Sequence, residues 1–418
     1  MLKMKLHLNH QIRYGSEDID GPIKYDSFEM PGDGLHIFDF LIICVKCKCM
    51  HSVRAASLTP GGRYSCLIVI SIIVFFFIGR GHGLEHENDS AGKTEAHYVE
   101  GGQVIMPLDS QTLPRLLKEA GWNPPDTFKA LIVRIEPYGK GGFAYFPYDY
   151  AGTSKDRENW WPASSVKLYA AVAALQRSRA LGFTPEAELT FHYEKGPVTR
   201  KLSTLVRRAI TPSNNVAFDQ LVEFVGFDRL NRHFLTKRNG LDRTVMLRAY
   251  TFRNKYPDTG RGCNRHSSRI TIAEGKKRRT LPRRTGRGEY DCPDQGNCTT
   301  LMELSEALRR VMMHEHLPAD EKYRLGKKEL GLLRSALSRR KKREGGVVKG
   351  LMDAFSDRQL KIYHKGGYSY EWFSDNVFLH FTDTDERWML AMASHPGRES
   401  LDEAVIHMAR IIGEGSFK

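Results

Sequence analysis

Apolar and polar positions alternate along residues 105–418 in patterns that predict a mixed helix and strand domain. Apolar residues recur at helical spacing in the segments 113–120, 166–181, 200–210, 214–225, 299–313, 328–338 and 401–412. Runs rich in β-branched and aromatic residues predict strands at 129–136, 142–146, 359–364, 372–381 and 387–394. The last three strands have short connections, which predict an antiparallel meander. We therefore expect an α+β fold: an antiparallel five-stranded sheet flanked by N- and C-terminal helices, with an inserted all-helical subdomain.

An unbroken apolar stretch precedes this domain. The sequence CLIVISIIVFFFI carries no charge and is shorter than the roughly 20 residues of a comfortable membrane span. It suits a signal-peptide core or a marginal membrane anchor, which we place at 65–79. A signal peptide begins near the start of a chain, so residues 1–64 form an uncertain leader, and Met50 is an alternative start. We expect an exported protein, periplasmic or anchored in the membrane and facing the periplasm.

A polar, Gly-rich stretch separates the apolar segment from the domain. Residues 80–104 lack a clear period and predict a linker to the domain at 105–418. Within that domain, a basic insertion occupies about 251–298.

The net charge of +14 is concentrated in two segments. Residues 251–290 hold 12 Lys and Arg against 3 Asp and Glu, and residues 339–343 form a second basic run. A nucleic-acid-binding fold would spread such charge along a groove, whereas this pattern indicates two solvated loops on a near-neutral body. We therefore expect no nucleic-acid partner.

Cysteines occur in both parts of the chain. Those of the leader lack zinc-ligand spacing, and we expect no metal and no cofactor. In the exported part, Cys292 could pair with Cys298, or Cys263 could pair with Cys298, and the sequence does not choose between them.

Ser164 and Lys167 are the first candidates for chemistry. They are three residues apart at the start of a predicted helix, so both side chains lie on one face. The free N–H groups of a helix start suit an acyl adduct with a developing oxyanion, and a partly desolvated Lys can act as the base for a Ser nucleophile. Ser164 could instead be a simple helix cap.

Two further motifs carry candidate residues. Ser213, Asn214 and Asn215 lie between two predicted helices, and Lys365, Gly366 and Gly367 follow His364 at the end of a predicted strand. Paired glycines allow a ligand to approach the backbone closely. Taken singly, these motifs could be a helix cap and a strand-to-turn exit.

Together, in this order, the motifs resemble the S-x-x-K, S-D-N and K-T-G set of class A β-lactamases and penicillin-binding proteins. The context Pro-Ala-Ser-Ser-x-Lys is also similar to that family's Pro-Ala-Ser-Thr-x-Lys, and the resemblance extends from about residue 105 to the end. A literal Ser-Asp-Asn at 374–376 lies after the Lys-Gly-Gly and inside a strand, so we assign the second motif to Ser213.

The resemblance implies a role for each matching residue. Ser164 would attack an amide carbonyl and become the acyl-enzyme, with Lys167 taking its proton. Ser213 would pass a proton toward the leaving nitrogen, and Asn215 would hydrogen-bond Lys167 or the substrate amide. Lys365 would stabilise negative charge and hold the Ser213 hydroxyl.

The third motif would also help to bind substrate, at Gly366, Gly367 and Tyr368. The backbone N–H groups of Ser164 and Tyr368 would form the oxyanion hole. Gly366 stands where the family has Thr or Ser, which removes a hydroxyl that helps to bind the substrate carboxylate, and Ser369 is the nearby hydroxyl that could compensate.

The second departure concerns the deacylating carboxylate. Class A β-lactamases carry a Glu in an E-x-x-L-N setting before the helix that begins here at about residue 299. Glu274 and Glu289 are the only Glu residues between 241 and 298, and Glu289 is the better candidate for deacylation.

Three functions remain open at this point. The first is a serine hydrolase, a monomer similar to class A β-lactamases, that cleaves the amide of a β-lactam or related small molecule. The second is a D-Ala-D-Ala carboxypeptidase or penicillin-binding protein acting on a peptidoglycan peptide. The third is a non-catalytic binding protein with this fold, against which the intact Ser164 and Lys167 argue.

Overall fold

The computed structural model describes residues 97–99, 103–251, 263–292, 296–339, 346–369, 372–396 and 398–417. All of these residues belong to one compact unit. The leader, Met50 and the apolar segment at 65–79 lie outside the described residues. Among the residues that are described, no helix combines the length and apolar character needed to cross a membrane.

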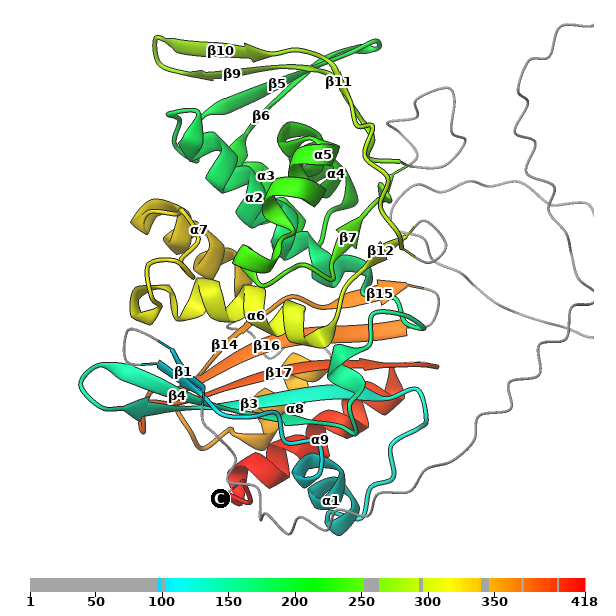
Figure 1. Ribbon diagram of the computed structural model, residues 1–418, viewed down its shortest axis with the longest axis vertical. Helices are drawn as coiled ribbons and strands as arrows, with labels where there is room; N and C mark the ends of the chain where they lie inside the picture. The colour runs from blue at the N-terminus through cyan, green and yellow to red at the C-terminus, as the bar shows by residue number, and fades with distance from the viewer. Residues whose placement is uncertain are drawn as a thin grey trace, which may run out of the picture. The chain divides into compact units, whose positions relative to one another are not determined.

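A nine-stranded sheet forms the base of the described domain (Figure 1). Its strand order is β1-β2-β4-β3-β17-β16-β14-β13, and β15 pairs with β16. The strands are β1 His97–Val99, β2 Gln103–Ile105, β3 Lys129–Tyr138, β4 Gly142–Asp149, β13 Ser338–Arg339, β14 Leu360–His364, β15 Gly367–Ser369, β16 Trp372–Phe381 and β17 Glu386–Ser394. All neighbours pair antiparallel except β2 and β4.

The five predicted strands form the centre of this sheet, and the α+β class is confirmed. Pairing of β3 with β17 joins the two ends of the domain, with Ile135 opposite Arg387. The additional strands are two or three residues long, too short to show an alternating pattern in the sequence. Two of them, β1 and β2, reach into the segment predicted as a linker.

Helices cover both faces of the sheet (Figure 1). On one face lie α1 Thr112–Glu119, α8 Val347–Ala354 and α9 Glu399–Gly413, whose apolar residues share a core with Ile132, Leu379 and Leu390 of the sheet. On the other face α6, Leu301–Met312, packs between the sheet and the remaining helices. These are α2 Lys167–Ala180, α3 Leu202–Ile210, α4 Asn215–Val225, α5 Phe227–Arg229 and α7 Lys327–Leu337, with the short helices η1 Thr153–Lys155, η2 Ala163–Val166, η3 Leu230–Phe234, η4 Lys237–Asn239 and η6 His314–His316.

The inserted subdomain contains strands as well as helices, unlike the all-helical expectation. A second sheet has the order β10-β9-β5-β6, built from β5 Glu188–Tyr193, β6 Gly196–Lys201, β9 Arg269–Glu274 and β10 Lys277–Leu281. Its apolar residues, such as Phe191 and Ile272, are fully buried and alternate with polar ones. Two small pairs complete the subdomain: β7 Val245–Met246 with β12 Asn297–Cys298, and β8 His266–Ser267 with β11 Arg284–Thr285.

Part of the basic insertion is therefore a β-hairpin and not a loop. The hairpin of β9 and β10 carries Lys277, Arg278 and Arg279 on its exposed positions and lies at the end of the subdomain far from the main sheet (Figure 1). The expectation of a solvated loop is therefore right about the exposure of these cations and wrong about their secondary structure. Of the cysteine pairings left open, the structure has Cys292 with Cys298, whose Cα atoms are 5.9 Å apart, and Cys263 is free.

Candidate active site

Ser164 lies in a short 3-10 turn, η2, that leads directly into α2. Ala163, just before it, has a φ of +46°, a conformation that non-glycine residues seldom adopt and that concentrates at functional sites. Ser165, the next residue, is buried, and its Oγ is 2.9 Å from Ser374 Oγ on β16. Ser374 also donates to the Pro162 carbonyl. The hydroxyl of Ser374 thus ties the turn to the main sheet and leaves Ser164 partly exposed.

Lys167 is the first residue of α2 and is fully buried. Its Nζ donates to the backbone carbonyl of Ser213, to Ser213 Oγ at 3.2 Å and to Asn215 Oδ1 at 2.6 Å. These acceptors come from the connection between α3 and α4, where Ser213 has a φ of +57°. The first two motifs of the sequence therefore meet directly.

The third motif meets the same hydroxyl from the other side. Lys365 follows β14 and is 3% exposed, and its Nζ donates to Ser213 Oγ at 3.0 Å and to the Gly366 carbonyl at 2.6 Å. Both lysines thus donate to one serine oxygen. The Ser213 proton remains available for another acceptor.

Burial perturbs both lysines. Desolvation lowers the pKa of Lys167 to about 7, although the nearby charge of Asp219 acts in the opposite direction. Desolvation, and then the charge of Lys167, lower the pKa of Lys365 to about 7. A lysine with such a pKa is neutral in a large fraction of molecules near pH 7 and can accept a proton.

Asp219 and Tyr250 were not anticipated from the sequence. Asp219 is buried on α4 and accepts hydrogen bonds at 2.8 Å from the backbone N–H groups of Tyr250 and Thr251. Burial raises the pKa of Asp219 to about 6. Its position four residues after Asn215, on the same helix face, was the signal that could have found it.

Tyr250 packs against Lys167. Its ring centroid is 5.5 Å from Lys167 Nζ, and its hydroxyl donates to the Ala163 carbonyl at 2.5 Å. Burial raises the pKa of the Tyr250 hydroxyl well above its usual range, so the side chain is neutral near pH 7 and contributes a hydrogen-bond donor and an apolar wall.

Gly367 approaches the nucleophile turn so closely that only glycine fits. A Cβ there would lie 2.4 Å from the Pro162 carbonyl oxygen and 2.9 Å from the Ser164 nitrogen. This contact places β15 beside the backbone of Ser164. Tyr368, the next residue, pairs with Phe373 in β16, and its side chain is exposed.

Gly366 lies beside a carboxylate. A Cβ there would be 3.2 Å from Asp375 Oδ2, and Asp375 Oδ1 is 2.9 Å from His364 Nδ1. Arg339 donates to the other nitrogen of His364 at 2.9 Å. The position where the resemblance leads one to expect a hydroxyl thus faces the buried Asp375, which is paired with the half-buried His364.

Glu289 does not belong to this hydrogen-bonded cluster. It is exposed in the connection after β11, and within the described part of the chain it has no hydrogen bond or ion pair. Glu274, the other Glu of that region, ends β9 in the second sheet and accepts a hydrogen bond from the Thr184 backbone N–H. The carboxylate whose charge acts on Lys167 is that of Asp219.

A sequence model described as the Beta-lactamase enzyme family matches residues 152–414. No curated protein matches the chain. Among solved structures, a class A β-lactamase from Bacteroides cellulosilyticus is similar with 14% identity and a TM-score of 0.44, covering 72% of this chain and 93% of its own. PBP-A has 16% identity and a TM-score of 0.47, covering 74% and 98%. The family match spans more than half of the chain and includes all three motifs, so the chain belongs to the β-lactamase enzyme family.

Proposed function

We propose that this enzyme forms an acyl-enzyme on Ser164 with the amide of a β-lactam or a related peptidoglycan peptide. Family membership supports the substrate class. The observation that carries the proposal is the buried Lys167, with a pKa of about 7, one helical turn after a partly exposed serine. The same two residues argue against a purely non-catalytic binding protein.

In the proposed reaction, Ser164 Oγ attacks the amide carbonyl carbon while neutral Lys167 accepts the hydroxyl proton. The carbonyl oxygen becomes an oxyanion that the backbone N–H groups of Ser164 and Tyr368 receive. Ser213 then donates its proton to the leaving nitrogen as the C–N bond breaks. Protonated Lys167 or Lys365, both within 3.2 Å of Ser213 Oγ, returns a proton to that hydroxyl.

We further infer that deacylation is slow, which favours the penicillin-binding alternative over rapid hydrolysis. Hydrolysis of the ester needs a base that activates water beside it. Asp219 is the carboxylate coupled to Lys167, but both of its oxygens accept hydrogen bonds from Tyr250 or Thr251. The ring of Tyr250 also packs against Lys167, with its centroid 5.5 Å from Nζ, and Glu289 is exposed outside this cluster.

Two features bear on the substrate. Asp375 beside Gly366 opposes a substrate carboxylate at the place where a hydroxyl would bind it, so we expect weak saturation by ordinary penicillins. Trp160, Trp161 and Trp372 line a cavity of about 240 Å³ beside the disulfide. Because Trp161 is three residues before Ser164, this cavity would suit an apolar side chain of the substrate.

Labelling by a fluorescent penicillin tests the proposal. The full chain should be labelled, Ser164→Ala should lose the label, and Ser335→Ala, an exposed serine on α7, should keep it. Undiminished labelling of Ser164→Ala would refute the assignment.

Nitrocefin separates the two functions. A burst of about one equivalent followed by negligible turnover supports a persistent acyl-enzyme. Steady hydrolysis refutes slow deacylation but leaves the acylation step intact.

Export is proposed from the sequence alone. Sequencing the amino terminus of the mature protein tests it, together with the start at Met50. A mature protein that retained residues 1–49 would contradict that start.

A further inference from the structure

A second cavity, of about 500 Å³, lies within the helical subdomain. Its walls come from the last turns of α2, the end of α4, η3, η4 and the segment around residue 323. The charged side chains of its lining are Arg177, Arg179, Arg229, Arg238, Lys322 and Arg324. No Asp or Glu belongs to the lining, and none of the active-site cluster reaches it.

Acidic side chains balance only part of this charge, since Arg179 lies 3.6 Å from Glu329 outside the lining. Burial lowers the pKa of Arg177 to about 9, and the charges of Arg284, Arg229 and Arg279 lower it further. Arg177 Nε and Gln176 Nε2 are both buried without a hydrogen-bond acceptor among the described residues. An unsatisfied buried donor is costly, so its retention calls for an explanation.

The helix dipole accounts for the position of only some of the cations that line the cavity. Arg177 and Arg179 lie in the last turn of α2, where cations are stabilised by the helix dipole. Arg179 also lies 3.6 Å from Glu329. Lys322 and Arg324 lie outside any helix, so the dipole does not account for them, although Lys322 Nζ donates to the Glu315 carbonyl at 3.2 Å.

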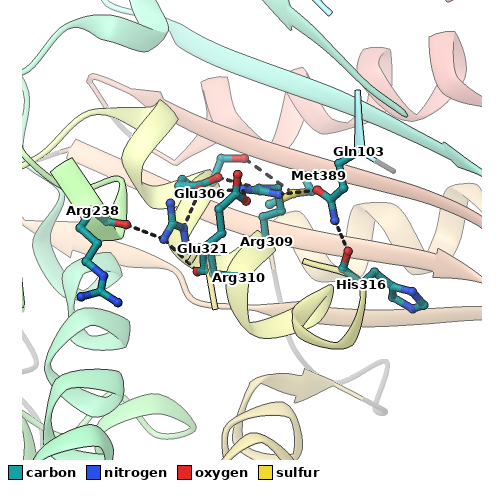
Figure 2. Close-up of polar contacts among 9 residues, drawn as sticks. Gln103, Arg238, Glu306, Arg309, Arg310, His316, Glu321 and Met389 are labelled. Atoms are coloured by element: carbon teal, nitrogen blue, oxygen red, sulfur yellow. Dashed lines mark hydrogen bonds and ion pairs between the residues drawn. The ribbon is translucent and has the colours of Figure 1, made fainter. Parts of the chain in front are cut away.

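Next to the cavity, two arginines and two glutamates form a network of hydrogen bonds and ion pairs (Figure 2). Arg310 donates at 2.9 Å to the backbone carbonyls of both Arg238 and Glu321. Arg309 forms ion pairs with Glu306 and with Glu321, each with a nitrogen-to-oxygen distance of 2.6 Å. Figure 2 shows the Arg238 guanidinium turned away from this network. The backbone at Arg238 and Glu321 is therefore held in place, and the carboxylates of Glu306 and Glu321 are already paired.

We propose that this cavity binds a small multivalent phosphate, such as a pyrophosphate or triphosphate group. Arg guanidinium groups present planar pairs of N–H donors that match phosphate oxygens, and several together require a ligand with several charges. The volume falls in the range of small-molecule sites. Such a ligand would supply acceptors for the unsatisfied donors and the negative charge that the lining lacks. The proposal does not depend on the reaction at Ser164.

Calorimetric titration of the full chain with sodium triphosphate at physiological salt tests the site. The matched variants are Arg177→Gln and Arg229→Gln in the lining and Arg208→Gln, an exposed residue of α3 outside it. Each lining variant should weaken binding about tenfold or more, equivalent to about 1.4 kcal/mol, while Arg208→Gln should bind like the unmodified chain. Titration with orthophosphate and with ATP distinguishes a single phosphate from a free or nucleotide-borne triphosphate.

Thermal unfolding separates binding from a structural role. Because neighbouring cations disfavour the charge of Arg177, Arg177→Gln should unfold at the same or a higher temperature without ligand. Triphosphate should raise the midpoint of the unmodified chain and not that of the variant. Absence of binding up to millimolar triphosphate, equal weakening by Arg208→Gln, or a lower midpoint of free Arg177→Gln would each overturn the proposal.

Discussion

The pH dependence of acylation follows directly from the state of Lys167. Only neutral Lys167 can accept the Ser164 proton, and burial lowers its pKa from 10.5 to about 7. The neutral fraction is then about nine tenths at pH 8 and about one tenth at pH 6. We therefore expect the second-order acylation rate constant to fall about tenfold from pH 8 to pH 6.

An ordinary lysine would give a different profile. With a pKa of 10.5, the neutral fraction would change about tenfold for each pH unit, or about a hundredfold between pH 6 and pH 8. The assay is the rate of labelling by a fluorescent penicillin under pseudo-first-order conditions, measured at constant ionic strength.

Two charged residues near Lys167, Asp219 and Lys365, provide control variants for its protonation. Asp219 raises the pKa of Lys167, so Asp219→Asn should move the inflection below pH 7. Lys365 titrates in the same range, and Lys365→Arg replaces it with a fixed cation. The tenfold change should persist in Lys365→Arg if Lys167 is the group that titrates. A flat profile, or a rate that still rises tenfold per unit above pH 8, would refute the assignment of Lys167 as the base.

Three further predictions concern the scaffold. Gly367→Ala should reduce the rate of acylation by about a hundredfold or more, because its Cβ would displace the Ser164 backbone, while the circular dichroism spectrum stays unchanged. Labelling of this variant at the normal rate would contradict the close approach of Gly367 to Ser164. Arg309→Ala should lower the free energy of unfolding, measured in urea, by about 3–5 kcal/mol, because it leaves buried carboxylates unpaired. The control Arg115→Ala removes one partner of an exposed ion pair and should lower it by at most about 1 kcal/mol. Reduction of Cys292–Cys298 should lower the free energy of unfolding by about 2 kcal/mol, and an unchanged urea midpoint after dithiothreitol would speak against the bond.

The long elements of the fold were predictable because each carries its own periodic pattern. The predicted helix at 166–181 corresponds to α2, and the predicted strand at 372–381 corresponds to β16. What escaped prediction is short or locally ambiguous. The β9 segment alternates apolar and polar residues, but the charge of β9 and β10 together indicated a loop.

The sequence by itself determined the class of the domain and three chemical motifs, because both depend on local residue types and on their order. Only the tertiary structure placed two lysines on the single hydroxyl of Ser213 and lowered their pKa values, since desolvation arises from burial by segments far apart in the chain. Tertiary packing also placed Asp219, which the sequence analysis did not single out, where its charge acts on Lys167, and left Glu289 exposed. It likewise gathered cations from separate helices and loops around one cavity, a grouping that their scattered positions along the chain do not reveal.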